Sequence, residues 1–361
     1  MMSADAVGGV WTYALELARG LAGQGIETLL ATLGPGPRPE QEREALAIPG
    51  LRLHQGDFPL EWMQDALCAQ DAAGDWLLGL AADFRPDVVH LNHYCHGHLD
   101  WRAPTLVVAH SCVYSWHAQV RRREPDPGWQ AYRDCATRGL QAANLVVAPT
   151  KAVLAEAERY YGPFRATRVI HNGRRPEDFM PGSKRERVLT AGRVWDDAKN
   201  VRALAAAGRT LSWPICVAGE AHHPEGGVAG FEGLHLLGRL NERRMAAAYA
   251  GASIYALPAR YEPFGLSVLE AALAGCALVL GDIPSLRELW DEAATFVPPD
   301  DPDVIARVLR GLIDNPGERA RWAQLARARA VHYAAARMVG VYLDTYTRLI
   351  HAKNEARACT S

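Results

Sequence analysis

The segment 261–272, YEPFGLSVLEAA, combines two carboxylates, a glycine turn and the predicted start of a helix. A helix beginning at Leu266 or Ser267 would present free backbone N–H groups and the positive end of its dipole, which together hold an anion. Gly265 would let a ligand approach the backbone closely. Glu270 lies about 6 Å along the helix axis at 1.5 Å per residue, within reach of a sugar attached to a bound phosphate.

Glu262 precedes this helix, on the other side of the predicted anion site from Glu270. Two carboxylates in these places would bracket a diphosphate and accept hydrogen bonds from hydroxyl groups on either side of it. The simpler interpretation is that Glu262 is solvated and that Glu270 only complements the helix dipole. The turn, the preceding strand and both glutamates occur together, and this combination favours a ligand site.

The segment 191–200, AGRVWDDAKN, supplies two cations. Arg193 follows an apolar strand, and Lys199 opens the next helix. Because the carboxyl ends of parallel strands form the edge at which ligands bind, we expect both cations there. Arginine offers a planar fork for phosphate oxygens and lysine a compact charge. A solvated surface pair is the alternative, and the anion-binding helix in the same half of the chain makes it less favoured.

Polar groups also follow strands in the N-terminal half of the chain. Gly8 and Gly9 form the first strand–helix turn and would let a ligand approach the backbone, although a plain tight turn is the alternative. His110 ends an apolar strand, and Asn92 follows the neighbouring one. A packing role for His110 and a plain surface loop at Asn92 stay open as alternatives.

Length, composition and charge limit the possible classes of protein. The 361 residues correspond to about two ordinary domains. A formal net charge of −2 excludes a global electrostatic attraction to nucleic acid, which needs a marked basic excess. The seven cysteines include no CxxC pair, which favours neither a zinc site nor a disulfide framework and fits a reducing cytosol.

Other signals are missing from the sequence. No apolar run approaches the roughly 18 residues of a membrane span, and the start MMSAD does not resemble a signal peptide. We therefore expect a cytoplasmic protein, and the basic segment 120–125 leaves a peripheral contact with the inner face of a membrane open. No GxxxxGK[ST], HExxH or GxSxG motif and no metal cluster occur, so we predict no metal. The formal DxD pattern at 301–303 is interpreted as a helix cap.

Short apolar runs alternate with amphipathic segments along the whole chain. Continuous apolar runs are typical of parallel strands that are covered on both faces, and strand–helix repetition predicts a doubly wound α/β architecture. The predicted strands span residues 27–33, 87–91, 105–109, 144–148, 168–171, 187–191, 214–218, 234–237, 254–257, 277–281 and 295–297. These are too many for one sheet, so we expect two domains that meet near 172–184.

The residues above resemble the retaining nucleotide-sugar glycosyltransferases of family 4, from about residue 4 to about residue 350. The resemblance is carried by Gly8, Gly9, Val10, His110, Asn172, Gly173, Gly192, Arg193, Lys199, Asn200 and the segment 262–270. It implies the GT-B type of α/β fold, in which two Rossmann-like domains face each other across an inter-domain cleft. An N-terminal acceptor-binding domain would cover 1–176, a C-terminal donor-binding domain would cover 177–337, and a C-terminal helix, 338–361, would cross back onto the first.

The resemblance also implies roles for individual residues. His110 and Glu262 would act in catalysis, close to the transferred sugar. Binding of the donor diphosphate would fall to Gly9, Arg193, Lys199, Gly265 and Leu266, that of the sugar and ribose to Phe264 and Glu270, that of the nucleobase to Leu240, and an acceptor contact to Asn92.

The implied reaction is retaining transfer of a hexose from a nucleoside diphosphate sugar to a hydroxyl acceptor, in glycan, glycolipid or glycoside biosynthesis. It would need no metal and no cofactor beyond the sugar nucleotide as co-substrate. A UDP-sugar is the expected donor, with GDP- and ADP-sugars as alternatives. A non-catalytic nucleotide-sugar-binding protein and an epimerase of the same fold are the alternative functions. The acceptor and the oligomeric state stay open.

Overall fold

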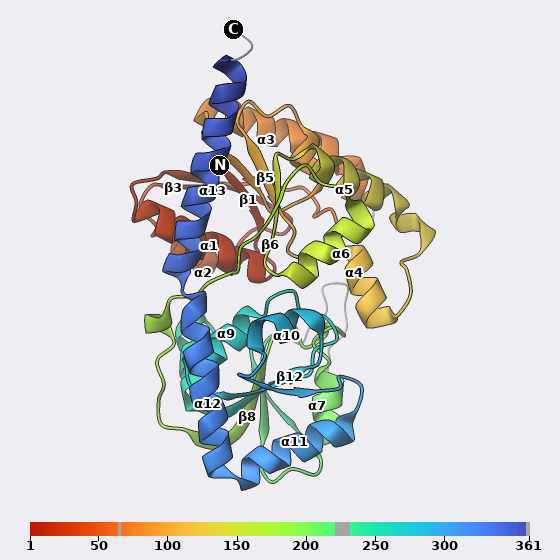
Figure 1. The fold of residues 1–361 in the computed structure, drawn as a ribbon, viewed down its shortest axis with the longest axis vertical. Helices are drawn as coiled ribbons and strands as arrows, with labels where there is room; N and C mark the ends of the chain where they lie inside the picture. The colour runs from red at the N-terminus through yellow and green to blue at the C-terminus, as the bar shows by residue number, and fades with distance from the viewer. Residues whose placement is uncertain (64–65, 221–231, 359–361) are drawn as a thin grey trace. The chain divides into compact units, whose positions relative to one another are not determined.

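The computed structural model describes residues 1–63, 66–220 and 232–358 and divides the chain into two compact units (Figure 1). Unit 1 comprises Met1–Ala118, Arg123–Gly173 and Ala335–Ser361, and unit 2 comprises Gln119–Arg122 and Arg174–Ala334. The main crossings therefore fall at 173/174 and 334/335, close to the positions 176/177 and 337/338 expected from the sequence.

Unit 1 is built on a seven-stranded parallel sheet in the order β3-β2-β1-β4-β5-β6-β7. Its strands are β1 (Met2–Asp5), β2 (Thr28–Leu33), β3 (Leu51–Gln55), β4 (Val89–Leu91), β5 (Thr105–Val108), β6 (Leu145–Ala148) and β7 (Thr167–Val169). Its helices are α1 (Gly9–Ala22), α2 (Pro39–Leu46), α3 (Gln70–Phe84), α4 (Val113–Trp116), α5 (Gln130–Ala142), α6 (Lys151–Tyr161) and α13 (Ala335–Ala358).

Unit 2 is built on a six-stranded parallel sheet in the order β10-β9-β8-β11-β12-β13. Its strands are β8 (Arg185–Ala191), β9 (Ile215–Ala218), β10 (Leu234–Gly238), β11 (Ala252–Leu257), β12 (Ala277–Gly281) and β13 (Thr295–Val297). Its helices are α7 (Val201–Gly208), α8 (Glu242–Gly251), α9 (Leu266–Leu273), α10 (Pro284–Trp290), α11 (Pro302–Asp314) and α12 (Pro316–Ala330). Asp301 caps α11 by accepting from the N–H of Val304, as expected.

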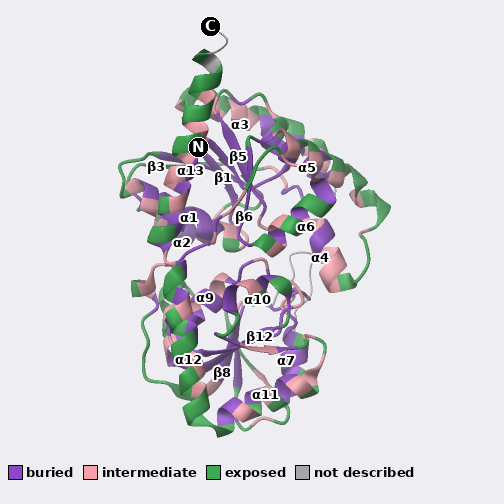
Figure 2. Ribbon diagram, viewed as in Figure 1, coloured by how far each residue is buried: buried purple, intermediate pink, exposed green. Residues whose placement is uncertain are grey.

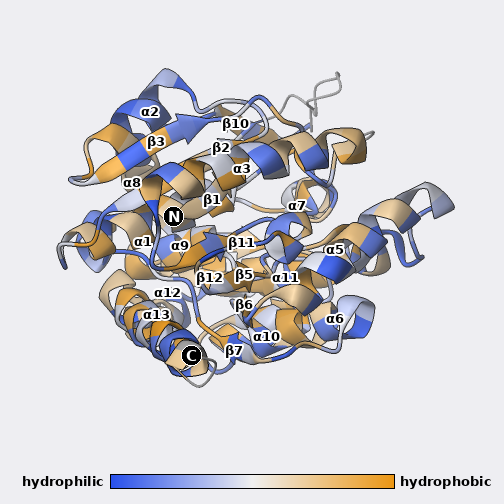
Figure 3. Ribbon diagram, turned by 90° about the horizontal axis from the view of Figure 1, so that it is seen from above, coloured by the Kyte–Doolittle hydropathy of each residue, from blue (hydrophilic) through white to orange (hydrophobic). Residues whose placement is uncertain are grey.

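The cores of both units are formed by strands that are buried on both faces. Every residue of β5 and β12 is buried, and these strands are hydrophobic (Figures 2 and 3). Full burial of a valine or leucine side chain stabilises a fold by about 1.5–3 kcal/mol, so continuous apolar runs favour this covered position over an exposed one. The prediction of a parallel, doubly wound α/β fold is confirmed.

The strand β3 was not predicted, because its sequence LRLHQ lacks an apolar run. It lies at one edge of the sheet, where it pairs with β2, and it is mostly exposed, which explains its polar composition. The C-terminal helix α13 belongs to unit 1 and packs against α1. Gly20 of α1 permits this contact, since any side chain there would overlap Val339.

The strand order reverses direction once in each sheet, between β1 and β4 in unit 1 and between β8 and β11 in unit 2. At such a switch point the loops that follow the two strands diverge to opposite sides and leave a crevice at the carboxyl edge, where ligands of α/β proteins bind. The loops after β8 and β11 carry the two segments that the sequence marked as candidates for binding a diphosphate.

Candidate active site

Two glycines shape the carboxyl edge of the unit 2 sheet. Gly192 directly follows β8 and Gly219 directly follows β9, both with φ of +148°. The N–H of Gly192 donates to the carbonyl of Ala218, and a Cβ at position 219 would overlap the carbonyl oxygen of Gly192. This backbone contact fixes the start of the loop that carries Arg193 and Lys199.

The predicted anion-binding helix is α9, and it begins at Leu266 after a left-handed residue. Gly265 has φ of +83°, a conformation that glycine adopts without the strain of a side chain. Phe264 is buried and packs its ring edge-on against Tyr333, with centroids 5.8 Å apart. The side chain of Phe264 is therefore engaged in packing, and its backbone and the N–H groups at the start of α9 are the candidates for contact with a ligand.

Lys199 and Glu262 form an ion pair at the switch point. The Nζ of Lys199 donates to Oε2 of Glu262 across 2.5 Å, and both side chains are largely buried. The hydroxyl of Ser285 holds the backbone carbonyl of Glu262 at 2.5 Å. The cation expected on the diphosphate and the carboxylate expected on the hexose are thus in direct contact.

Arg193 is also paired with a carboxylate, which the sequence analysis did not single out. Its Nη2 lies 2.7 Å from Oδ2 of Asp196. Burial raises the pKa of Asp196, but Arg193 and Lys199 outweigh it and leave the pKa below its usual value. The spacing of three residues between Arg193 and Asp196 could have indicated this ion pair from the sequence.

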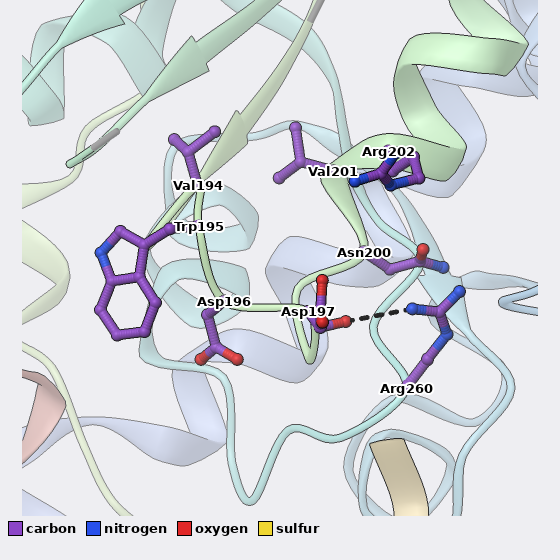
Figure 4. A pocket seen from close by; sticks show the side chains of 8 residues that line it. All are labelled: Val194, Trp195, Asp196, Asp197, Asn200, Val201, Arg202 and Arg260. Atoms are coloured by element: carbon purple, nitrogen blue, oxygen red, sulfur yellow. Dashed lines mark hydrogen bonds between the residues drawn. The ribbon is translucent and has the colours of Figure 1, made fainter. Parts of the chain in front are cut away.

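A small cavity of about 120 Å³ lies against the same loop (Figure 4). Its lining includes Trp195, Asp196, Asp197 and Asn200, and Arg260 donates to the backbone carbonyl of Asp197 at 3.4 Å. Asn200 has φ of +55° and donates its amide to two carbonyls, so it anchors the loop at the start of α7. The loop that presents Arg193 and Lys199 is therefore held from both ends.

Glu270 lies in α9, as predicted, and it too has a cationic partner. The Nε of Arg174 is 2.9 Å from Oε1 of Glu270, and Nη2 of the same arginine is 2.8 Å from Oε1 of Glu242. Leu240, the predicted nucleobase residue, is partly buried just before α8 and packs against the unit 2 core. Arg174 was missed because it lies in a stretch that reads as an inter-domain linker.

Gly9, Asn92 and His110 follow β1, β4 and β5, at the carboxyl edge of unit 1. The Nδ2 of Asn92 donates to the carbonyl of Ser3 at 2.6 Å, which turns Oδ1 towards Nε2 of His110 at 2.7 Å. Since Oδ1 can only accept, His110 carries its proton on Nε2. Gly9 is the first residue of α1, next to Gly8 in the turn that follows β1.

The His110 imidazole is neutral at neutral pH. Burial, reinforced by His93, lowers its pKa to about 3. The ring is packed against Tyr13 in an edge-to-face contact with centroids 4.7 Å apart. His110 can therefore orient a hydroxyl group without adding charge to the site.

Two family models match most of the chain between them. Residues 7–178 match the model described as Glycosyltransferase Family 4, and residues 199–329 match the model described as Glycosyl transferases group 1. The chain belongs to the family 4 glycosyltransferases. Both loops of unit 2 that were predicted to bind an anion contribute residues to the second matched range.

Two relatives of this glycosyltransferase carry the same name. The chain is 28% identical to a D-inositol 3-phosphate glycosyltransferase of Xylanimonas cellulosilytica, over 94% of this chain and 93% of the relative. It is 26% identical to a D-inositol 3-phosphate glycosyltransferase of Streptomyces scabiei, over 95% of this chain and 87% of the relative. The predicted glycosyltransferase activity is confirmed at this level, and the alternatives of an epimerase or a mere binding protein are not favoured.

Solved structures with the same fold include a sucrose-phosphate synthase from Thermosynechococcus elongatus, with a TM-score of 0.80, 17% identity and coverage of 97% of this chain and 99% of that one. HepE of Anabaena, in complex with UDP and glucose, gives a TM-score of 0.75 at 16% identity, covering 96% and 100%. These likenesses confirm the predicted GT-B fold of the glycosyltransferase.

The described residues contain neither a cluster suited to a metal ion nor a helix suited to crossing a membrane. Across 1–63, 66–220 and 232–358, no three His, Cys, Asp or Glu side chains are grouped so that they could hold a metal ion. Within the same ranges, no helix combines the length and the apolar character that crossing a membrane requires.

Proposed function

We propose that this glycosyltransferase transfers a hexose from a nucleoside diphosphate sugar to a hydroxyl acceptor with retention of the anomeric configuration. The observation that carries the proposal is the meeting of Lys199 and Glu262 at the unit 2 switch point, beside the N-terminus of α9. A cation, a carboxylate and free N–H groups at one crevice suit a diphosphate with a sugar attached to it.

The charges favour breakage of the bond between the sugar and the diphosphate. As that bond breaks, negative charge develops on the leaving phosphate, and fixed cations stabilise it without having to reorganise. Arg193 and Lys199 would meet this charge, and the N–H groups at the start of α9 would add to them. We therefore propose that the protein's own cations take the place of a metal ion.

Glu262 is proposed to orient sugar hydroxyls rather than to attack the sugar. Retaining hydrolases place a second carboxyl group about 5–5.5 Å from their nucleophile to serve as acid and base. The partner of Glu262 is instead the ammonium group of Lys199, which cannot fill that role while it holds a phosphate. Attack by the acceptor on the same face, with a donor phosphate oxygen taking its proton, fits these residues better.

UDP is the proposed nucleotide of the donor. HepE of Anabaena, which shares the fold, is described in complexes with UDP and with UDP-glucose. GDP- and ADP-sugars are the alternatives that the test must include. We also propose that the enzyme works in the cytoplasm, in the synthesis of a glycan, glycolipid or glycoside.

The test measures release of nucleoside diphosphate from UDP-, GDP- and ADP-glucose, with and without hydroxyl acceptors that include inositol 3-phosphate. Acceptor-dependent release, with a product that keeps the donor's anomeric configuration by NMR, would support the proposal. An inverted product would refute retention. Formation of a different sugar nucleotide without acceptor would indicate an epimerase, and binding without turnover would indicate a binding protein.

A further inference from the structure

Arg174 occupies an unusual place in unit 2. It is 4% exposed, and it is the first residue of the long segment 174–334 of this unit. Its N–H donates to the carbonyl of Tyr333 at 3.1 Å, and Arg174 forms a parallel bridge with Ala334. The backbone at the start of this segment is thereby bonded to the backbone at its end, which is far away in sequence.

The guanidinium of Arg174 joins two helices through their carboxylates. It contacts Glu270 of α9 at 2.9 Å and Glu242, the first residue of α8, at 2.8 Å. The Glu270 side chain is 12% exposed and that of Glu242 is 45% exposed. Phe179 lies under the guanidinium, with its ring centroid 5.0 Å from Cζ.

The ion pair between Arg174 and Glu270 lies in largely buried surroundings. The buried Tyr249 lies nearby, and its pKa is raised by burial first and by the Glu270 carboxylate second. Burial opposes the charged form of a carboxylate, and a fixed cation offsets that cost. The ion pair with Arg174 places a buried cation directly against the Glu270 carboxylate.

We propose that Arg174 is a positioning residue for the nucleoside of the donor. It holds Glu270 at the ribose and, through Glu242, the start of α8 close to Leu240, so that the spacing between the ribose and nucleobase contacts is set by one guanidinium. The inference rests on the proposed function, because it takes Glu270 as the ribose ligand.

The experiment compares UDP with 2′,3′-dideoxy-UDP by calorimetry, because the ratio of their dissociation constants isolates the ribose hydroxyls. In the wild-type protein UDP should bind more tightly. R174M should weaken UDP binding by roughly tenfold, since a charge-assisted contact is left without its orienting partner. Binding of dideoxy-UDP should change much less, so the ratio should fall towards one.

R174K and R319M complete the design. R174K keeps the charge without the planar fork and should restore part of the ratio. Arg319 stacks on Trp213, with Cζ 4.8 Å from the ring centroid, and donates to two backbone carbonyls, so R319M is the matched control and should keep the wild-type ratio.

Each remaining outcome has a definite meaning. Equal losses for both nucleotides in R174M would overturn the inference, because a merely structural arginine acts on them alike. Unchanged affinities for both nucleotides in R174M would overturn it too. If R174M does not fold, a wild-type ratio in R174K would do the same. Failure of the wild-type protein to bind UDP, GDP or ADP would instead refute the proposed function.

Discussion

The ammonium nitrogen of Lys199 and a carboxylate oxygen of Glu262 lie 2.5 Å apart, although the two residues come from loops after different strands. Lys199 follows β8 and Glu262 follows β11, the two strands that flank the switch point of unit 2. A diphosphate that reaches Lys199 must share or displace this carboxylate. Diphosphate binding at the proposed site would therefore replace or share the ion pair of Lys199 with Glu262.

Neutralising Glu262 should mainly reduce turnover, whereas neutralising Glu270 should mainly weaken nucleotide binding. Glu262→Gln frees Lys199, so affinity for free nucleoside diphosphate should be kept or should rise, while turnover at saturating donor falls by roughly a hundredfold or more. Glu270→Gln should weaken binding of both nucleotide and donor, with a smaller effect on turnover. Calorimetry and initial rates measure the two effects.

The reverse pattern would show that the donor is oriented the other way along α9. If neither substitution changed binding or turnover, the active site would lie elsewhere.

Loss of either donor-site cation should weaken binding of nucleoside diphosphate. Arg193→Ala and Lys199→Ala should each cost about 2–4 kcal/mol, because each removes a charged partner and leaves a carboxylate, Asp196 or Glu262, without its cation. Arg310→Ala is the control, since Arg310 binds Thr210 on the exposed side of unit 2. Wild-type affinity in both site variants, measured by calorimetry, would refute the assignment.

Activity should survive chelation of metal ions. The proposed neutralisation of the leaving phosphate uses Arg193, Lys199 and the N-terminus of α9, so EDTA should leave the initial rate within about twofold of the untreated enzyme. A rate that collapses with EDTA and returns with manganese or magnesium would contradict this prediction. Addition of calcium, which substitutes poorly for magnesium in phosphate chemistry, separates specific from non-specific recovery.

Stability should fall as the pH drops below the ordinary histidine pKa. Burial lowers the pKa of four histidines of unit 1 from 6.5, to about 3 for His90 and His110 and about 4 for His93 and His96. Between 6.5 and about 4 the unfolded chain binds more protons than the folded one. Each histidine then lowers the free energy of unfolding by about 1.4 kcal/mol per pH unit.

Urea unfolding from neutral pH down to about pH 5 measures the slope. His93→Asn should reduce it by about one proton, because burial lowers the pKa of His93 to about 4. A slope of zero in the wild-type protein would contradict the prediction.

Sequence reasoning predicted the elements whose identity depends on local pattern. The apolar runs of β5 and β12 and the glycine turn at Gly265 are local signals, and each lies where it was expected. The strand β3 was not predicted, because an exposed edge strand folds without an apolar run in its sequence. The degree of burial of a strand therefore explains both why β5 and β12 were predicted and why β3 was not.

The ion pairs of the site could not be predicted in the same way. Lys199 and Glu262 are 63 residues apart in sequence, and Arg174 reaches Glu270 from a segment that resembles a linker. Which basic side chain pairs with which carboxylate depends on the order of the strands in the sheet. Several strand orders are compatible with the same sequence pattern. Arg193 and Asp196 are the exception, because they are three residues apart.

The contact between Gly192 and Gly219 limits how this enzyme could be evolved in the laboratory. Any side chain at Gly219 would overlap the carbonyl oxygen of Gly192 and displace the loop that carries Arg193. Libraries that aim at a new donor should therefore hold both glycines constant and randomise Trp195 and Asp197, which line the cavity beside that loop. Most variants of such a library would keep the fold, so a screen would sample changes in substrate preference rather than losses of protein.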